Sequence, residues 1–171
     1  AALCGTPIAL VSLVDADRQW FKARVGLELT ETPVEQAVCA YALGQDELLQ
    51  IEDLEADSRT SSNPLVTAED GIRFYAGTPL NTQDGYTLGT LCVIDTEVRP
   101  GGLNEIQREG LAALGRQVMK MLEMRQTLIQ RDLQLVRHRR RDEIMRRQRE
   151  ERNEQARQKS VNRRIQSHEA Q

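Results

Sequence analysis

Apolar residues in the first hundred positions fall into short runs that are typical of β-strands. The run 7–14 (PIALVSLV) and the alternating run 19–26 (QWFKARVG) are joined by a polar turn, which predicts a hairpin. The runs 72–80 and 86–95 predict a second hairpin, because an Asp-Gly pair stands between them. Two hairpins of this kind indicate an antiparallel sheet.

The segment between the hairpins mixes helical and strand patterns. Thr32 is a suitable N-cap for a short helix over 33–43, which Gly44 would end. Residues 48–54 predict a third strand, and a short helical or irregular stretch follows Pro64. Strands followed by helices along the chain predict an α+β fold.

A long helix is predicted from Asn104, which can cap its first turn. Apolar residues then recur at intervals of three and four, which favours pairing with a second copy of the helix. At about 1.5 Å per residue the helix would extend on the order of 100 Å and needs a partner. The predicted dimer seam consists of Leu111, Leu114, Val118, Met121, Leu122, Leu128, Leu135 and Val136.

Charge divides the chain near Met124. Residues 1–124 carry 9 basic and 19 acidic side chains, a net charge of -10, whereas residues 125–171 carry 14 and 7, a net charge of +7. We therefore expect one acidic domain over 1–124 and a basic coiled-coil linker over 125–171. The sequence has no apolar run long enough for a membrane span and no signal-peptide pattern, so we expect a cytoplasmic protein.

Several segments recur together in an order that is typical of a known family. The runs PIALVSLVDADRQWFKARVGL, ETPVEQAVCAYAL, NPLVTAEDGIRFYAGTPL and DGYTLGTLCVID resemble the GAF domains of bacterial sensor histidine kinases and diguanylate cyclases. The resemblance implies a five- or six-stranded antiparallel sheet flanked by helices, a ligand cavity on one face, and dimerisation through terminal helices. It also implies an N-terminal helix, of which Ala1 to Gly5 would be only the end.

The same resemblance suggests which residues border the cavity. Arg73 is the one cation in its strand and would clamp a carboxylate or phosphate. The alternative is that Arg73 pairs with Asp15, Asp17 or Asp95 while the aromatic residues fill the core. The candidate pocket residues are Trp20, Phe21, Cys39, Tyr41, Arg73, Phe74, Tyr75, Thr90 and Cys92.

The distribution of cysteine and histidine argues against most cofactors. Both histidines, His138 and His168, lie in the basic segment, so we expect no haem and no metal site in the domain. Neither Cys39 nor Cys92 has the adjacent histidine that is common in bilin-binding GAF domains. Some GAF-like proteins reduce free methionine sulfoxide with a cysteine, but no basic residue or histidine lies within two positions of any cysteine here.

The basic segment permits three interpretations. It lacks the aromatic residues of single-strand binders, which argues against nucleic acid. A solvated helix is a second possibility, and a dimeric signalling helix with a polar seam at Gln148, Gln155 and Asn162 is the interpretation we favour. The triplet Ser167-His168-Glu169 resembles part of a kinase phosphoacceptor box but is too short to assign.

These observations predict a non-catalytic sensory or relay domain. A ligand or an upstream helix would shift the packing of the domain, and the dimeric helix would pass the change to an output domain, with histidine kinase as the first expectation. The alternative is a ligand-free dimerisation scaffold whose cavity is filled by its own aromatic residues.

Overall fold

The computed structural model describes the backbone of residues 1–169 and the side chains of residues 1–159 except Ala156. The chain forms two units, one over Ala1–Leu122 and one from Glu123 onward. The first unit is built on a six-stranded sheet in the order β3-β2-β1-β6-β5-β4, with every neighbouring pair antiparallel. The strands are β1 Ile8–Val14, β2 Arg18–Val25, β3 Glu31–Pro33, β4 Leu49–Ile51, β5 Phe74–Asn81 and β6 Thr87–Asp95. This confirms the expected antiparallel α+β architecture.

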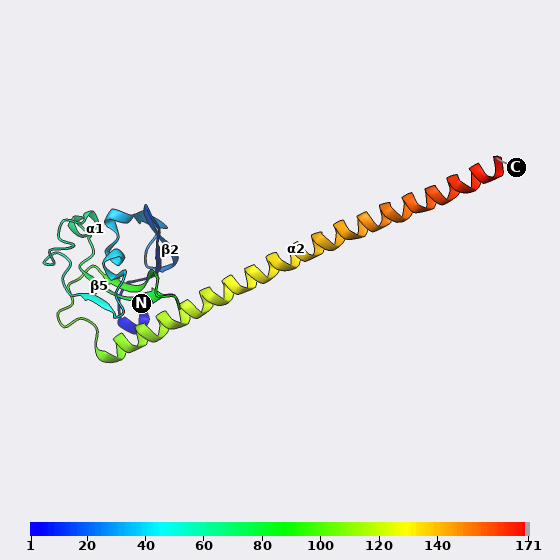
Figure 1. Ribbon diagram of the computed structural model, residues 1–171. Helices are drawn as coiled ribbons and strands as arrows, with labels where there is room; N and C mark the ends of the chain where they lie inside the picture. Colours follow the sequence, from blue (N-terminus) through cyan, green and yellow to red (C-terminus); the bar gives the residue numbers. More distant parts are fainter. Residues whose placement is uncertain (170–171) are drawn as a thin grey trace. The chain divides into compact units, whose positions relative to one another are not determined.

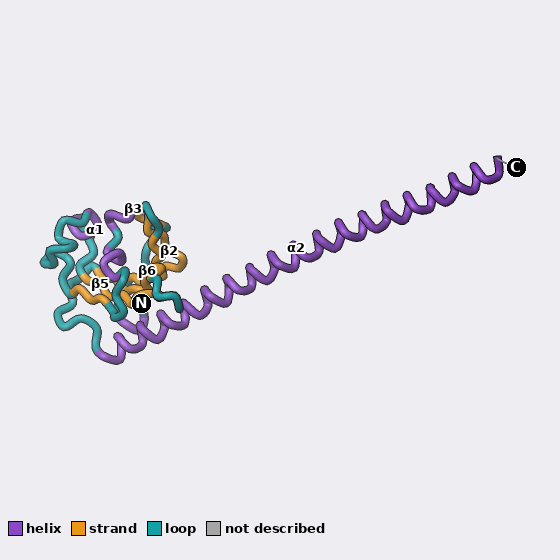
Figure 2. The backbone as a smooth tube through the Cα atoms, viewed as in Figure 1, coloured by secondary structure: helices purple, strands orange, loops and turns teal. Residues whose placement is uncertain are grey.

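The helices of the first unit are short, except for the one that leaves it. The 3-10 helices are η1 Ala2–Cys4, η2 Val34–Gln36 and η3 Val38–Ala42, and the α-helices are α1 Pro64–Thr67 and α2 Glu105–Glu169. Figure 1 shows α2 leaving the sheet domain, and Figure 2 shows that loops make up much of the domain opposite the start of α2. No helix in the described part of the chain is both long and apolar enough to cross a bilayer.

The single helix predicted over 33–43 is wrong. Thr32 lies in β3, where it pairs with Gln19 of β2, so it does not cap a helix. Ala37 has an extended backbone, with φ -77° and ψ 98°, and separates η2 from η3. Pairing with the edge of β2 therefore overrides the local helical signal, because tertiary contacts outweigh weak intrinsic propensities.

The two faces of the sheet are covered by different elements. Alternation along β5 sends Tyr75 to one face and Phe74 to the other. Tyr75 lies in a core shared with η3 and α1, whereas Phe74 packs with Cys4 of η1 and Leu111 of α2. In Figure 1 the start of α2 and the N-terminal segment lie on one side of the sheet and α1 on the other.

The first turns of α2 are held by capping and close packing. Asn104 Oδ1 accepts a hydrogen bond from the backbone N–H of Gln107 at 2.9 Å, and Gln107 Oε1 accepts from Asn104 N–H at 3.0 Å, which confirms the predicted cap. Gly115 lets the helix approach the sheet, since a Cβ there would lie 2.6 Å from the Thr78 methyl. Leu111 is 2% exposed within this packing. Its prediction as a dimer-seam residue is therefore wrong, because its own sheet already covers it.

Candidate functional site: an apolar cavity beside a cysteine pair

A cavity of about 250 Å³ lies between the sheet and the loops that cover its α1 side. Its walls come from β1, β2, β3, η2, η3, α1, β5 and β6, from the connections 27–30 and 68–72, and from Thr96 after β6. Most of the lining is aliphatic or aromatic, with a few polar groups, as expected of a small-molecule site. The lining residues are Ile8, Leu10, Gln19, Phe21, Leu27, Leu29, Thr32, Gln36, Val38, Cys39, Pro64, Leu65, Ala68, Asp70, Ile72, Tyr75, Ile94 and Thr96.

Two of the polar lining groups are buried without a hydrogen-bond partner. Gln19 is 4% exposed and Thr32 is 6% exposed, and neither Gln19 Oε1 nor Thr32 Oγ1 has a partner. The two residues lie directly opposite each other on β2 and β3. Because cross-strand partners are close neighbours on one face, both oxygens are available to a single bound group. An unpartnered buried oxygen costs about 1–3 kcal/mol, which a hydrogen-bond donor in the cavity would recover.

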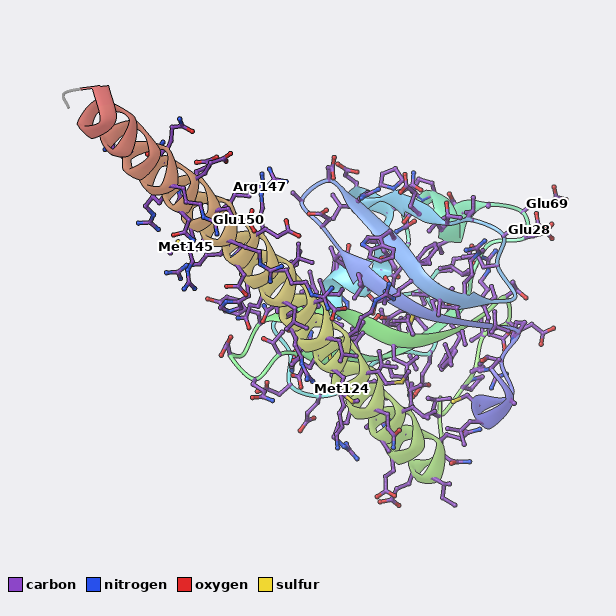
Figure 3. All side chains as sticks on the ribbon, turned by 90° about the vertical axis from the view of Figure 1, so that its right-hand side faces the viewer. Glu28, Glu69, Met124, Met145, Arg147 and Glu150 are labelled. Carbon is purple, nitrogen blue, oxygen red and sulfur yellow. The ribbon has the colours of Figure 1, made fainter. Side chains whose placement is uncertain are left out.

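The charged residues around the cavity are acidic. Asp70 is the one charged residue among those that line it. Glu28 and Glu69, which are labelled in Figure 3, are exposed and lie in loops whose neighbouring residues line the cavity. These carboxylates disfavour an anionic ligand and tolerate a neutral or cationic one.

A pair of cysteines lies at the wall of the cavity. Cys39 of η3 and Cys92 of β6 are both buried free thiols, and their sulfur atoms are 3.8 Å apart. Cys39 lines the cavity, whereas Cys92 does not. On the same side, the Tyr75 hydroxyl donates to Thr90 Oγ1 at 3.2 Å.

The two thiols differ in acidity. A hydrogen bond from Cys92 lowers the pKa of Cys39 to about 6 against the opposing effect of burial, and polar side chains nearby add to the lowering. The pKa of Cys92 is raised well above its ordinary value by the same hydrogen bond and by burial. Cys39 is also the member of the pair that faces the cavity.

The structure brings five of the nine predicted pocket residues together. Phe21, Cys39 and Tyr75 line the cavity. Thr90 and Cys92 lie immediately behind it, where they contact Tyr75 and Cys39 respectively. Strand alternation sends four of them to the same face of the sheet, and the fifth, Cys39, lies in η3 on that face.

The other four predicted residues lie outside the cavity. Phe74 points to the opposite face of the sheet, and Trp20 alternates away from Phe21 and lies under the Lys22 ammonium, 5.5 Å from its ring centroid. Tyr41 is 40% exposed, and its hydroxyl donates to the Arg59 carbonyl at 2.6 Å.

Arg73 serves the fold and not the cavity. Its Nη1 donates to the Val66 carbonyl at 2.6 Å, and its Nε lies 3.5 Å from a carboxylate oxygen of Glu55. The ion-pair partner is therefore Glu55, and not Asp15, Asp17 or Asp95 as the sequence suggested. Asp95 instead pairs with Arg99.

Sequence reasoning missed Gln19 and Thr32. Gln19 stands two positions before Phe21, so the alternation of β2 already placed it on the inward face. Thr32 carried no such signal, because the strand that holds it is three residues long. Within the part of the chain that the structure describes, no group of three or more His, Cys, Asp or Glu side chains could hold a metal ion.

The surface of α2 carries a regular apolar line. Leu114, Met121, Leu128 and Leu135 recur every seven residues and are all exposed. Val136 is also exposed, whereas Val118 and Leu122 are half-buried. Farther along the helix, Figure 3 shows the side chains of Met145, Arg147 and Glu150 projecting from α2. A repeat of seven is the spacing used by paired helices.

The fold and the cavity match one protein family. A family model for the GAF domain matches residues 1–122, the whole sheet domain. The chain belongs to the GAF domain family. Among curated proteins, the GAF chain is 49% identical over 94 residues to a cyclic di-GMP phosphodiesterase of Pseudomonas aeruginosa. The match covers 55% of this chain and only 16% of that protein, so this chain spans a small part of its relative.

Solved structures show the same fold at low identity. The GAF domain of an Acinetobacter phosphoenolpyruvate-protein phosphotransferase matches with a TM-score of 0.54 and 15% identity, covering 72% of this chain and 74% of that one. The free methionine-R-sulfoxide reductase of Neisseria meningitidis matches with a TM-score of 0.53 and 20% identity, covering 70% and 68%. A domain of a phosphotransferase and a reductase thus share this architecture, so the likeness shows the fold alone.

Proposed function

We propose that this chain is a cytoplasmic sensory module of a bacterial signal-transduction protein. A small ligand binds the cavity, and a dimeric helix passes the resulting change to an output domain. The observation that carries the proposal is the pair of unpartnered oxygens on Gln19 and Thr32 inside an otherwise apolar cavity. In this proposal the domain senses and does not catalyse.

The chemistry of the cavity defines the ligand class. The apolar walls favour a largely apolar molecule, and the volume of about 250 Å³ limits it to a small one. Gln19 Oε1 accepts hydrogen bonds and Thr32 Oγ1 can accept or donate, so the ligand carries a hydroxyl or N–H donor. With Asp70 at the wall, the ligand is neutral or cationic.

We propose that the output domain of the full-length protein makes or hydrolyses cyclic di-GMP. The support is the 49% identical relative, which is a cyclic di-GMP phosphodiesterase. The sequence alone had favoured a histidine kinase and had included diguanylate cyclases in the resemblance. The relative shifts the preference toward an enzyme that makes or hydrolyses this dinucleotide.

The dimer would form through α2. Four exposed apolar residues at intervals of seven, from Leu114 to Leu135, form the contact line that a parallel copy can cover. Ligand binding changes the packing of the domain, and the packing of α2 on the sheet through Leu111 carries that change into the helix pair. Val118 and Leu122, which are half-buried, would contribute to the same dimer seam near the sheet domain.

Native mass spectrometry of the purified protein tests ligand binding and assembly together. We expect a dimer that carries added mass in the wild type. Gln19→Leu should give a dimer that retains less of this mass, because the ligand loses a hydrogen-bond acceptor. Gln45→Leu, at an exposed position outside the cavity, is the control and should retain it.

A second measurement uses indole as the probe, a neutral apolar molecule with one N–H donor. We expect indole to raise the Tm of the wild type and to raise that of Gln19→Leu less. Benzoate, which is similar in size but anionic, should give a smaller rise because of the acidic surroundings. A bare dimer whose Tm responds to neither probe would favour the ligand-free scaffold instead.

A further inference from the structure

The sulfur atoms of the cysteine pair are in contact but are not bonded. The sulfur atoms of Cys39 and Cys92 are 3.8 Å apart, and a disulfide requires about 2.0 Å. Cys92 lies in β6, which pairs with β1 on one side and β5 on the other. Cys39 lies in η3, a five-residue 3-10 helix. Closure therefore requires a small movement of η3 toward a fixed strand.

The cavity provides access to one member of the pair. Cys39 is 1% exposed and lines the cavity, whereas Cys92 is fully buried and does not line it. A volume of about 250 Å³ exceeds the roughly 30 Å³ that a water molecule occupies, so hydrogen peroxide can be accommodated. Cys39 is the first of the two thiols that such an oxidant would meet, and Cys92 is next to it to complete the reaction.

We propose that Cys39 and Cys92 form a reversible disulfide when a hydroperoxide enters the cavity. The Cys39 sulfur attacks one peroxide oxygen, the O–O bond breaks, and Cys39 sulfenic acid and water form. The Cys92 sulfur then attacks the Cys39 sulfur, and the S–O bond breaks as the second water leaves. The two thiols lose two electrons and two protons, which reduce hydrogen peroxide to two water molecules. A dithiol reductant returns the pair to the thiol form.

The third cysteine provides an internal comparison. Cys4 is as buried as the pair but lies on the opposite face of the sheet, packed with Phe74 and Leu111. It does not line the cavity, and burial raises the pKa of its thiol. Cys4 should therefore stay reduced under conditions that oxidise Cys39, because it has neither access nor a neighbouring thiol at hydrogen-bond distance among the described residues.

Oxidation would change the wall of the ligand cavity. Val38 and Cys39 both belong to η3 and both line the cavity. A bond between Cys39 and Cys92 draws η3 toward the sheet and reduces the space beneath it. This inference stands independently of the proposed ligand, because it rests on the thiols and not on Gln19 or Thr32.

Peptide mapping after treatment with hydrogen peroxide tests the disulfide. The intact chain should lose about 2 Da, the mass of two hydrogens, and dithiothreitol should restore it. Trypsin places the three cysteines in separate peptides, with Cys39 in 25–59, Cys92 in 74–108 and Cys4 in 1–18. We expect 25–59 linked to 74–108, with Cys4 still open to alkylation after denaturation.

Matched variants distinguish oxidation of the Cys39–Cys92 pair from oxidation of any buried cysteine. Cys4→Ala removes an equally buried thiol and should leave the loss of 2 Da unchanged. Cys39→Ala and Cys92→Ala should each abolish it. The inference is overturned if the wild type shows a link through Cys4, if Cys39 is oxidised to sulfinic acid without a link, or if both cysteines stay reduced.

Hydrogen exchange tests the effect on the cavity wall. The amides of Ala40 and Leu43 donate to the carbonyls of Ala37 and Ala40 at 3.0 and 3.1 Å, so they report on η3. We expect their exchange to slow in the oxidised protein and to recover after reduction. Unchanged exchange in a cross-linked protein would contradict a change in the cavity wall.

Discussion

At the scale of single residues, one of two buried threonines has a hydrogen-bond partner for its hydroxyl and the other has none. Thr60 Oγ1 donates to the Leu54 carbonyl at 2.6 Å, whereas Thr32 Oγ1 has no partner. Both residues are buried, so valine would fill nearly the same space at each position. The difference between them isolates the energetic effect of an unsatisfied hydroxyl from that of volume.

We expect Thr32→Val to leave the free energy of unfolding of the ligand-free protein unchanged or to raise it by about 1 kcal/mol, because it removes an unsatisfied group. Thr60→Val should lower it by about 1–2 kcal/mol, because the Leu54 carbonyl loses its donor. Urea denaturation measures both. Equal destabilisation by the two substitutions would show that Thr32 already has a partner in the apo protein.

At the scale of elements, α2 has two contact faces with different partners. Leu111 and Met119 are buried on the sheet domain, whereas Leu114 and the residues at intervals of seven beyond it are exposed. A helix can serve both because adjacent residues are about 100° apart around its axis, so the exposed Leu114 and the buried Gly115 next to it face different directions. Of these two faces, the exposed line is the one that a second copy of the chain can contact.

Two leucines of equal exposure test this line. Leu128 is 56% exposed and belongs to the repeat, whereas Leu133 is 54% exposed and stands five positions farther along, outside it. We expect Leu128→Glu to weaken the dimer at least about tenfold, a change of about 1.4 kcal/mol, and Leu133→Glu to have little effect. Sedimentation equilibrium measures the dissociation constant. A stronger effect at Leu133 would assign the dimer to another face.

At the scale of the whole molecule, the chain joins an acidic GAF domain to a basic helix. Residues 1–124 carry a net charge of -10 and residues 125–171 a net charge of +7. Past Val136 the predicted seam contains Gln148 and Gln155, and Asn162 lies outside the described side chains. Polar seam residues reduce the stability of a single helix pairing, which suits the change of register that the proposed mechanism requires.

Replacing Gln148 and Gln155 by leucine in the full-length protein should hold the output in one state. Leucine at both positions would favour one helix pairing over the alternatives, so the response to the upstream signal should be lost. Cyclic di-GMP turnover, measured with and without that signal, gives the readout. Gln130→Leu lies outside this seam and is the control. A normal response in the double variant would contradict transmission through the helix.

Local patterns in the sequence determined much of the fold. Apolar runs predicted β1, β5 and β6, alternation predicted β2, and the cap at Asn104 marked the start of α2, because each signal lies within a few neighbouring residues. The order of these segments was also enough to indicate the GAF family. For the cavity, the resemblance to GAF domains suggested Phe21, Cys39 and Tyr75, and all three line it.

Only the tertiary structure decided which groups meet and which are left without a partner. Cys39 and Cys92 are 53 positions apart in sequence, and no local pattern relates their sulfur atoms. Thr32 lies in a strand because it pairs with the edge of β2. Leu111 is buried because α2 packs on the sheet at that position. A cavity is the space that remains after all side chains have packed, so it is a property of the whole domain and of no single segment.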